Sequence, residues 1–340
     1  MKKTFLISLV IAAVSLCCQT VVAQSNATIV VGFYNLENLF DTIDNPLTID
    51  EEYLPDGKLQ WNTMRYESKL KNLAYAISQM PQELAVLGVA EVENAQVMED
   101  LAKQPLLESR NLKVVHYESP DRRGVDVGLF YNEALFTPLR SESHRVKTDI
   151  PDFYTRDQLV VTGMMADEEI SIVVVHWPSR RGGKSTARMD AASTTRAIID
   201  SLYAANPYAK IIMMGDLNDD PVDKSLTEAV GAKSKMEETR PKEMFNPCYG
   251  LYKKGLGSLG YNDQWNLFDQ ILVSYDLLQK EKGIYDGLTY LTSRIFNRDF
   301  LRAQNGQYKG YPLRTHSSGV WTNGYSDHFP SLIWLVKGER

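Results

Sequence analysis

The sequence predicts an α/β fold in which strands and helices form a layered sandwich. Several strand-like runs are too apolar for a sheet with one solvent-exposed face, so both faces of those strands should be buried. Helical patterns separate some of the runs, while others follow one another too closely to leave room for a helix. Hairpins and helix crossovers in one chain indicate a layered arrangement. With 340 residues and 44% hydrophobic content, the chain can bury a sizeable core.

The expected strands are runs rich in Val, Ile, Leu and Phe, bounded by polar or turn-forming residues. They lie at residues 28–34, 84–90, 112–117, 125–131, 135–145, 158–165, 170–176, 210–215, 268–274 and 331–336. The four runs between 125 and 176 are consecutive, which predicts hairpins in that part of the chain.

Two amphipathic helices are expected, each of them shortly before a strand. Asn62 can cap the first, and its apolar face carries Leu70, Leu73, Ala74 and Ile77. The second covers residues 184–205, with an apolar stripe of Ala191, Thr195, Ile198, Ile199 and Leu202. Each helix would pack that face against a sheet. Two long loops, at 41–60 and 231–263, are expected to border a site.

The N-terminus resembles a secretory leader. Lys2 and Lys3 precede an apolar run from Phe5 to Val14, and the small residue Ala23 offers a cleavage point before Gln24. We therefore expect a signal peptide at 1–23, a single domain at 24–340, and export to the periplasm or the medium. A membrane anchor is disfavoured because the apolar run is too short to span a bilayer, so no transmembrane segment is expected.

Cysteine usage and charge narrow the class of protein further. Of three cysteines, Cys17 and Cys18 lie in the leader, where a lipid attachment is an alternative, although Leu16 stands where a small residue is expected. Cys248 alone remains in the mature chain, so it can form no internal disulfide and is expected to fill core space. Loss of Lys2 and Lys3 would take the net charge from −6 to −8, which argues against a protein that coats nucleic acid through bulk charge.

Polar side chains stand at or just past the ends of several predicted strands. An imidazole or carboxylate at these points can take part in metal binding and proton transfer. The set comprises Asn35, Glu91, His176, Asp216, Asn218, Asp327 and His328.

In order and spacing this set resembles the endonuclease/exonuclease/phosphatase superfamily. The similarity runs from Asn35 to Pro330, and Phe33–Asp41 together with Ala90–Asn94 is most similar to the bacterial secreted-nuclease branch. One departure is Ala90, where many members have Gln before the metal-binding Glu. The resemblance implies a four-layered α/β sandwich, in which two mixed β-sheets pack face to face with helices outside.

The resemblance implies a divalent-metal site held by Asn35, Glu91 and Asp327. Oxygen ligands of this kind suit Mg²⁺ or Mn²⁺, and no Cys/His cluster suggests structural zinc. The competing interpretation of Glu91 is a surface carboxylate at the start of a loop.

The resemblance also implies catalytic roles for five residues. Asp216 would take part in proton transfer, and Asn218 would orient water or hold a phosphoryl oxygen. Both residue types also favour turns and helix caps, which is the competing interpretation. His176 would donate a hydrogen bond to a phosphate oxygen, as an alternative to serving as a core histidine. His328 would lie near the attacking water, and Asp269 would fix its tautomer, unless Asp269 is only a charge at a strand edge.

Two short basic clusters stand beside predicted site strands. Arg122 and Arg123 form the first, and Arg180, Arg181 and Lys184 form the second. Arginine can clamp phosphate through its bidentate fork, so both clusters are candidates for substrate binding, with solvated loops as the alternative. Arg123 is the member that the resemblance places nearest the reacting phosphate, in a catalytic role.

We therefore expect an exported, metal-dependent phosphodiesterase, a nuclease that works as a monomer by in-line attack of water. One alternative is a phosphatase or lipid phosphodiesterase acting on inositol phosphates or sphingomyelin. For that alternative, the segment containing Tyr249, Leu251, Tyr252 and Leu256 would supply an exposed apolar loop. The other alternative is a surface binding protein without catalysis, which would have no need of the complete polar set.

Overall fold

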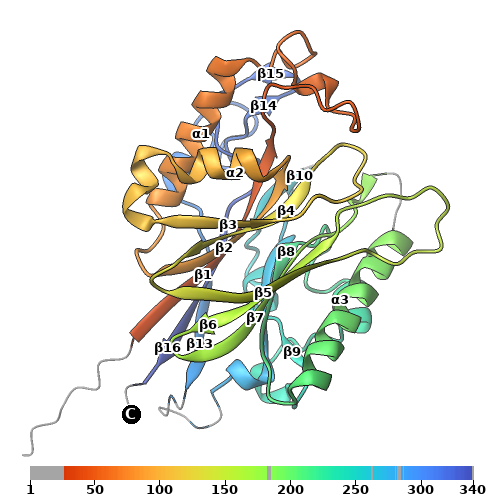
Figure 1. Ribbon diagram of the computed structural model, residues 1–340, viewed down its shortest axis with the longest axis vertical. Helices are drawn as coiled ribbons and strands as arrows, with labels where there is room; N and C mark the ends of the chain where they lie inside the picture. Colours follow the sequence, from red (N-terminus) through yellow and green to blue (C-terminus); the bar gives the residue numbers. More distant parts are fainter. Residues whose placement is uncertain are drawn as a thin grey trace, which may run out of the picture.

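Two β-sheets packed face to face form the centre of the molecule, as the family resemblance implies, and each sheet has six strands (Figure 1). The computed structural model describes residues 27–181, 185–261, 263–279, 281, 285 and 287–338. The expected signal peptide at 1–23 and Lys184 lie outside these residues. Figure 1 shows α1 (Thr63–Ser78) and α2 (Ala95–Ala102) on one side of the sheets and α3 (Ser185–Ala205) on the other.

The first sheet contains both ends of the domain. In spatial order its strands are β13 (Leu288–Ile295), β16 (Ser331–Lys337), β1 (Ala27–Leu39), β2 (Leu84–Val92), β4 (Asp126–Asn132) and β3 (Leu112–His116). Only β1 and β2 run parallel, and α1 makes the crossover between them, whereas the other neighbours are antiparallel.

The second sheet repeats this plan. Its strands are β5 (Phe136–His144), β6 (Gln158–Met165), β7 (Glu168–His176), β8 (Lys210–Asp216), β12 (Asp269–Ser274) and β9 (Met244–Phe245). Its one parallel pair, β7 and β8, is connected through α3. The other neighbours are antiparallel. Both sheets are therefore mixed.

Shorter elements decorate the ends of the sandwich. They are α4 (Cys248–Lys253), the hairpins β10 (Leu259–Tyr261) with β11 (Gln264–Asn266) and β14 (His316–Ser317) with β15 (Val320–Trp321), and the helical turns η1 (Glu51–Tyr53), η2 (Pro105–Arg110), η4 (Ser225–Val230), η5 (Met236–Glu238), η6 (Tyr275–Leu277) and η7 (Asp299–Leu301).

The core has three main layers. One lies between α1, α2 and the first sheet, one between the two sheets, and one between the second sheet and α3. The sheets approach closely at Gly88, where an added Cβ would stand 2.5 Å from the sulfur of Met214. Any side chain at Gly88 would therefore push the two sheets apart.

Both helices predicted from periodicity are present. The side chain of Asn62 accepts a hydrogen bond from the backbone N–H of Arg65, so it caps α1 as expected. The four residues predicted for its apolar face are all buried. Cys248 is buried in the core as predicted, and burial raises its pKa to about 12.

The sequence prediction missed three features. Strand β13 and helix α2 were not anticipated, and residues 231–263 are not one long loop, because they contain β9, α4 and β10. The two residues of β9 extend the edge of the second sheet, which is too short a run for an apolar pattern to reveal. No helix in the described part of the chain is both long and apolar enough to cross a membrane.

Candidate active site

Three neighbouring strands of the second sheet bring an imidazole and two carboxylates into one row. His176 ends β7, Asp216 ends β8, and Asp269 begins the antiparallel strand β12. In the strand register, Asp216 pairs with His176 on one side and with Asp269 on the other. Residues paired in register point to the same face of a sheet, so the three side chains share a face.

Strand alternation explains which face this is. Each polar residue stands two positions along its strand from a residue in the core between the two sheets. The pairs are Val174 with His176, Met214 with Asp216, and Ile271 with Asp269. The candidate site therefore continues the inter-sheet core at the point where its apolar layer ends.

The first sheet faces this row with an amide and a third carboxylate. Asn35 stands two positions beyond the core residue Phe33 on β1, so it points into the same layer. Glu91 would alternate away from that layer, but the register of β2 shifts between Ala90 and Val92, and Glu91 has a φ of 60°. A bulge of this kind re-aims a side chain, and it turns Glu91 toward the site.

These groups form one connected cluster. Asn35 Nδ2 donates a 3.0 Å hydrogen bond to Asp216 Oδ2. His176 Nε2 lies 3.5 Å from Asp216 Oδ2 and 3.9 Å from Glu91 Oε1. His328 Nε2 lies 3.9 Å from Asp216 Oδ2. Asp216 is therefore the centre of the cluster, with both imidazoles and the amide around one of its oxygens.

His328 is held by Asp269 on the side away from Asp216. Its Nδ1 lies 2.6 Å from Asp269 Oδ2, and because a carboxylate only accepts, Nδ1 carries the proton. Burial alone would lower the pKa of His328, but the carboxylates of Asp269 and Asp216 raise that pKa well above its usual value. The pairing fixes the ring so that Nε2 faces Asp216.

His176 has the opposite electrostatic environment. Burial lowers its pKa well below the ordinary value, and the nearby Arg156 and Arg123 lower it further. Its Nδ1 has no hydrogen-bond partner among the described residues. Arg156 also donates to the backbone carbonyls of His176 and Trp177, and so braces the end of β7. A neutral His176 therefore faces a cationic His328 across Asp216.

Asp216 combines deep burial with a tight turn. Burial raises its pKa to about 7, with Asp269 and Glu91 adding to the rise and His328 opposing it. Its Oδ1 accepts from the backbone N–H of Asn218, whose φ is 50°. The side chain of Asn218 donates to the carbonyl of Trp177, which ties this turn to the end of β7.

Two observations bear on a metal ion at Glu91 and Asn35. Glu91 Oε2 accepts from the backbone of Asn38, yet among the described residues no Lys or Arg pairs with Glu91. That unpaired acidic charge fits a bound cation. The amide of Asn35 is already engaged, because its oxygen accepts from the backbone of Glu37 while its nitrogen donates to Asp216.

Asp327 differs from Glu91 because a cation already neutralises it. Its Oδ2 accepts from Arg314, and Oδ1 lies 3.8 Å from His328 Nε2. A second possible metal site is the buried group of Asp216, Asp269 and His328, whose nearest ligand atoms all lie within 4.8 Å of one another. Residue types of this kind bind divalent ions.

A charged network behind Asp327 was not predicted. Arg314 also lies 3.6 Å from the buried Glu37, which accepts from the backbone of Thr315 and lies 3.9 Å from the fully buried Lys69. Lys69 donates to Tyr325 O, two residues before Asp327. Lys69 falls within the predicted α1, and its burial follows only from tertiary packing. The network positions the segment that carries Asp327 and His328.

The predicted substrate-binding arginines differ in their surroundings. Arg123 is half exposed, with its Nε 3.7 Å from Asp121 Oδ1. Arg122 is exposed and donates to Asp152 O. Arg180 is tied to its own chain, since it donates to Asn218 O and to the carboxylates of Asp220 and Asp223. Arg181 is exposed.

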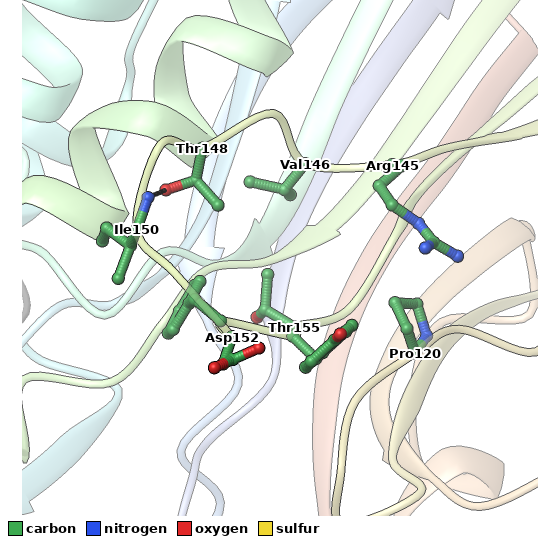
Figure 2. Close-up of a pocket in the computed structure, with 9 residues that line it drawn as sticks. Pro120, Arg145, Val146, Thr148, Ile150, Asp152 and Thr155 are labelled. Carbon is green, nitrogen blue, oxygen red and sulfur yellow. Dashed lines mark hydrogen bonds between the residues drawn. The ribbon is translucent and has the colours of Figure 1, made fainter.

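A pocket of about 220 Å³ adjoins Pro120, two residues before Arg122. Figure 2 shows side chains that line it. Pro120 lies on one side and the segment from Arg145 to Thr155 curls around the other, with Ile150 N donating to Thr148 Oγ1. No residue of the Asp216 cluster lines it, so we do not assign it to the reaction.

Comparison with known proteins agrees with the α/β sandwich described above. Residues 30–337 match the family described as "Endonuclease/Exonuclease/phosphatase family". No curated protein matched the chain.

Several solved structures are similar to the chain. TDP2 of D. rerio, complexed with a single-strand DNA product, shares 14% identity at a TM-score of 0.55, covering 91% of this chain and 99% of that one. A family protein from Bacteroides thetaiotaomicron shares 15% at 0.54, covering 93% and 97%. A mannosyl-6-phosphatase from the same organism shares 15% at 0.52, covering 90% and 99%.

Proposed function

The chain belongs to the endonuclease/exonuclease/phosphatase family and is therefore a phosphoesterase, and we propose that it is a divalent-metal-dependent phosphodiesterase that acts as a nuclease. The observation that carries the proposal is the Asp216 cluster. In it a buried carboxylate lies between two histidines of opposite pKa shift and an amide, at one end of the two sheets. Such a constellation can move protons and donate to a charged phosphate at the same point.

The residues divide between proton handling and charge stabilisation. Asp216, with a pKa near 7, can accept a proton from water close to neutral pH. His328, kept protonated by Asp269, can donate from Nε2. His176 and Asn35 can donate to the phosphate where charge develops. Asn218 secures the turn on which Asp216 stands, which favours in-line attack by holding the groups in fixed positions.

Glu91 is the residue most suited to hold the ion, because its charge lacks a cationic partner among the described residues. A bound Mg²⁺ or Mn²⁺ would stabilise negative charge on the phosphate. Asp327 would reach such an ion through Oδ1, since Oδ2 is bonded to Arg314. Asn35 would have to share the oxygen that accepts from Glu37.

The choice of nucleic acid as substrate rests on two supports. TDP2, which has the same fold, was captured with a DNA product. The loop that carries Arg122 and Arg123 is tied to the end of β7, because Asp121 accepts from Arg156, which also donates to the backbone carbonyl of His176. From this loop the two arginines can contact phosphates flanking the scissile one. Within the segment 247–261, Leu251 and Tyr252 pack against the core, so only Leu256 and Tyr261 remain as exposed large apolar side chains for a lipid enzyme to use.

The test is a substrate panel with purified protein. Plasmid DNA, RNA, bis-p-nitrophenyl phosphate and p-nitrophenyl phosphate are incubated with Mg²⁺, Mn²⁺ or EDTA, and His328→Ala serves as the inactive control. We expect metal-dependent cleavage of DNA or RNA and slower hydrolysis of the small diester. Rapid release of phosphate from the monoester without nucleic-acid cleavage would instead assign a phosphatase.

Export is a separate proposal that rests on the leader sequence. If residues 1–23 are a signal peptide, the mature protein should begin near Gln24 and lie in the periplasm or the medium. Mass spectrometry of the N-terminus tests this. An intact Met1 would contradict it, and a lipid on Cys17 or Cys18 would place the protein on a membrane surface.

A further inference from the structure

A second group of ligand-type side chains lies outside the Asp216 cluster, where β3 ends and β4 begins. His116 is the last residue of β3, Asp126 is the first residue of β4, and Glu118 follows in the loop between them. One ligand atom from each lies within 4.8 Å of the other two. The side chains of His116 and Asp126 are only 3% and 2% exposed, whereas that of Glu118 is 68% exposed.

The two buried members stand at ion-pair distance from each other, and in the described part of the chain the two facing atoms make no hydrogen bond or ion pair with any other side chain. His116 Nε2 lies 3.1 Å from Asp126 Oδ2, but neither atom has a hydrogen-bond partner among the described residues. Asp126 Oδ1, by contrast, accepts from both the backbone and the hydroxyl of Ser119. Oδ2 is therefore the atom left for another partner. Buried polar atoms normally find one, and a buried charge is costly unless it is paired.

The distance between these atoms suits two ligands of one ion. With bonds of about 2.0 Å in a tetrahedral site, neighbouring ligand atoms stand about 3.3 Å apart. His116 and Asp126 already meet that spacing. Glu118 Oε1 lies 3.9 Å from Nδ1, the other ring nitrogen of His116. To join Nε2 and Asp126 at one ion, this exposed side chain must swing toward Nε2 by up to about 1.5 Å, which it can do without moving its backbone. An imidazole with two carboxylates favours zinc over Mg²⁺, which takes oxygen ligands and water.

We propose that His116, Glu118 and Asp126 form a Zn²⁺ site that is separate from the candidate active site and ties together the ends of the loop at 117–125. The placement gives the ion a structural task. β3 is the edge strand of the first sheet, and Tyr117, next to His116, contacts Ser141 on β5, the edge strand of the second sheet. Arg123 lies on the loop that the ion would close, so zinc should limit the motion of Arg123. The proposal does not depend on the substrate.

Zinc binding is measured on the full-length mature protein by calorimetry, after EDTA treatment and dialysis, with Mg²⁺ in excess. The measurement is made in a background carrying both Glu91→Gln and His328→Ala, which removes a ligand from each of the two metal sites considered at the catalytic cluster. We expect one Zn²⁺ per chain and a rise in Tm of a few °C at saturating zinc. Co²⁺ in place of zinc should give the visible absorption of a low-symmetry site.

Three variants and one control assign the site. His116→Gln and Asp126→Asn should each weaken binding by more than about 100-fold, because changes outside the ligands already cost 10–100-fold. Glu118→Gln should also weaken it, and its exposure ensures that the variant folds. His144→Gln is the matched control, since among the described residues the one ion-pair contact of His144 is with Glu142, at 3.5 Å. It should bind like the parent.

Three results would overturn the proposal. The first is that the parent protein binds no zinc beyond background, which would leave only an ion pair between His116 and Asp126. The second is that Glu118→Gln and His116→Gln bind zinc as tightly as the parent protein does. The third is that His144→Gln loses zinc binding as completely as His116→Gln does, which would place the ligands elsewhere.

Discussion

Replacing Asp269 by Asn tests whether the carboxylate positions His328. The change keeps the size of a fully buried side chain but removes the charge 2.6 Å from His328 Nδ1. Asn can present its amide nitrogen to the ring, and Nδ1 would then lose its proton while Nε2 keeps its own, so the ring would become neutral. The variant would also lose the main electrostatic cause of the raised His328 pKa.

The expected loss follows from the strength of that contact. A hydrogen bond to a charged group is worth about 1.5–3 kcal/mol, and each 1.36 kcal/mol is tenfold in rate, so kcat should fall roughly 10- to 100-fold. Complete loss of the Nδ1 proton, with misorientation of the ring, would take the loss toward about 10⁴-fold. The KM for a small diester should change little, because Asp269 lies behind His328.

The same pair predicts a pH dependence of stability. The folded-state pKa of His328 is raised above the unfolded value, so the pair stabilises the protein fully below about pH 6.5. The contribution declines as pH rises through the raised pKa. The difference in unfolding free energy between wild type and Asp269→Asn, measured by denaturant titration in EDTA, should therefore be largest at low pH.

Asp190→Asn is the matched control, because Asp190 accepts a 2.7 Å hydrogen bond from Thr148 and, among the described residues, forms no hydrogen bond or ion pair with the Asp216 cluster. It should leave kcat and its pH profile unchanged. Wild-type kcat and an unshifted pH profile in Asp269→Asn would refute the role of Asp269 as a positioning residue.

Four further predictions concern the metal, His176 and the two arginines Arg180 and Arg123. EDTA should abolish hydrolysis, Mg²⁺ or Mn²⁺ should restore it, and Glu91→Gln should lower kcat by roughly 10²-fold; full activity in EDTA would contradict metal dependence. His176→Ala should lose most activity and remain folded, because His176 stands at a strand end, and a collapse of Tm in thermal unfolding would identify a core histidine instead. Arg180→Ala should lower Tm and affect all substrates equally, because the guanidinium holds Asn218 O and Asp220. Arg123→Ala should keep its Tm but weaken DNA cleavage more than hydrolysis of a small diester, and equal losses on both substrates would contradict a flanking-phosphate role.

The sheets and the row of polar residues were accessible from the sequence because both depend on local patterns. Alternation within a strand has a period of two, so the core residue Val174 places His176 on the same face whatever the strand packs against. Apolar runs likewise marked most strands, and Asn62 marked the start of α1. The resemblance supplied the pairing of Asp269 with His328, which no spacing in the sequence could reveal.

Other features were decided only when distant segments met. Glu91 points into the site because β2 has a bulge beside β4, and a bulge depends on the pairing of two strands. Arg180 was predicted to face a substrate, yet the structure surrounds it with its own acidic neighbours.

The sequence by itself determined the layered α/β class, the strand faces and the residue types of the cluster. These follow from side-chain periodicity and composition, which are properties of short segments. Only the tertiary structure decided the partners of each charge. Glu37, Lys69 and Arg314 lie far apart along the chain and meet behind Asp327. Burial at that meeting point makes each charge depend on the others, because an unpaired charge out of water is costly.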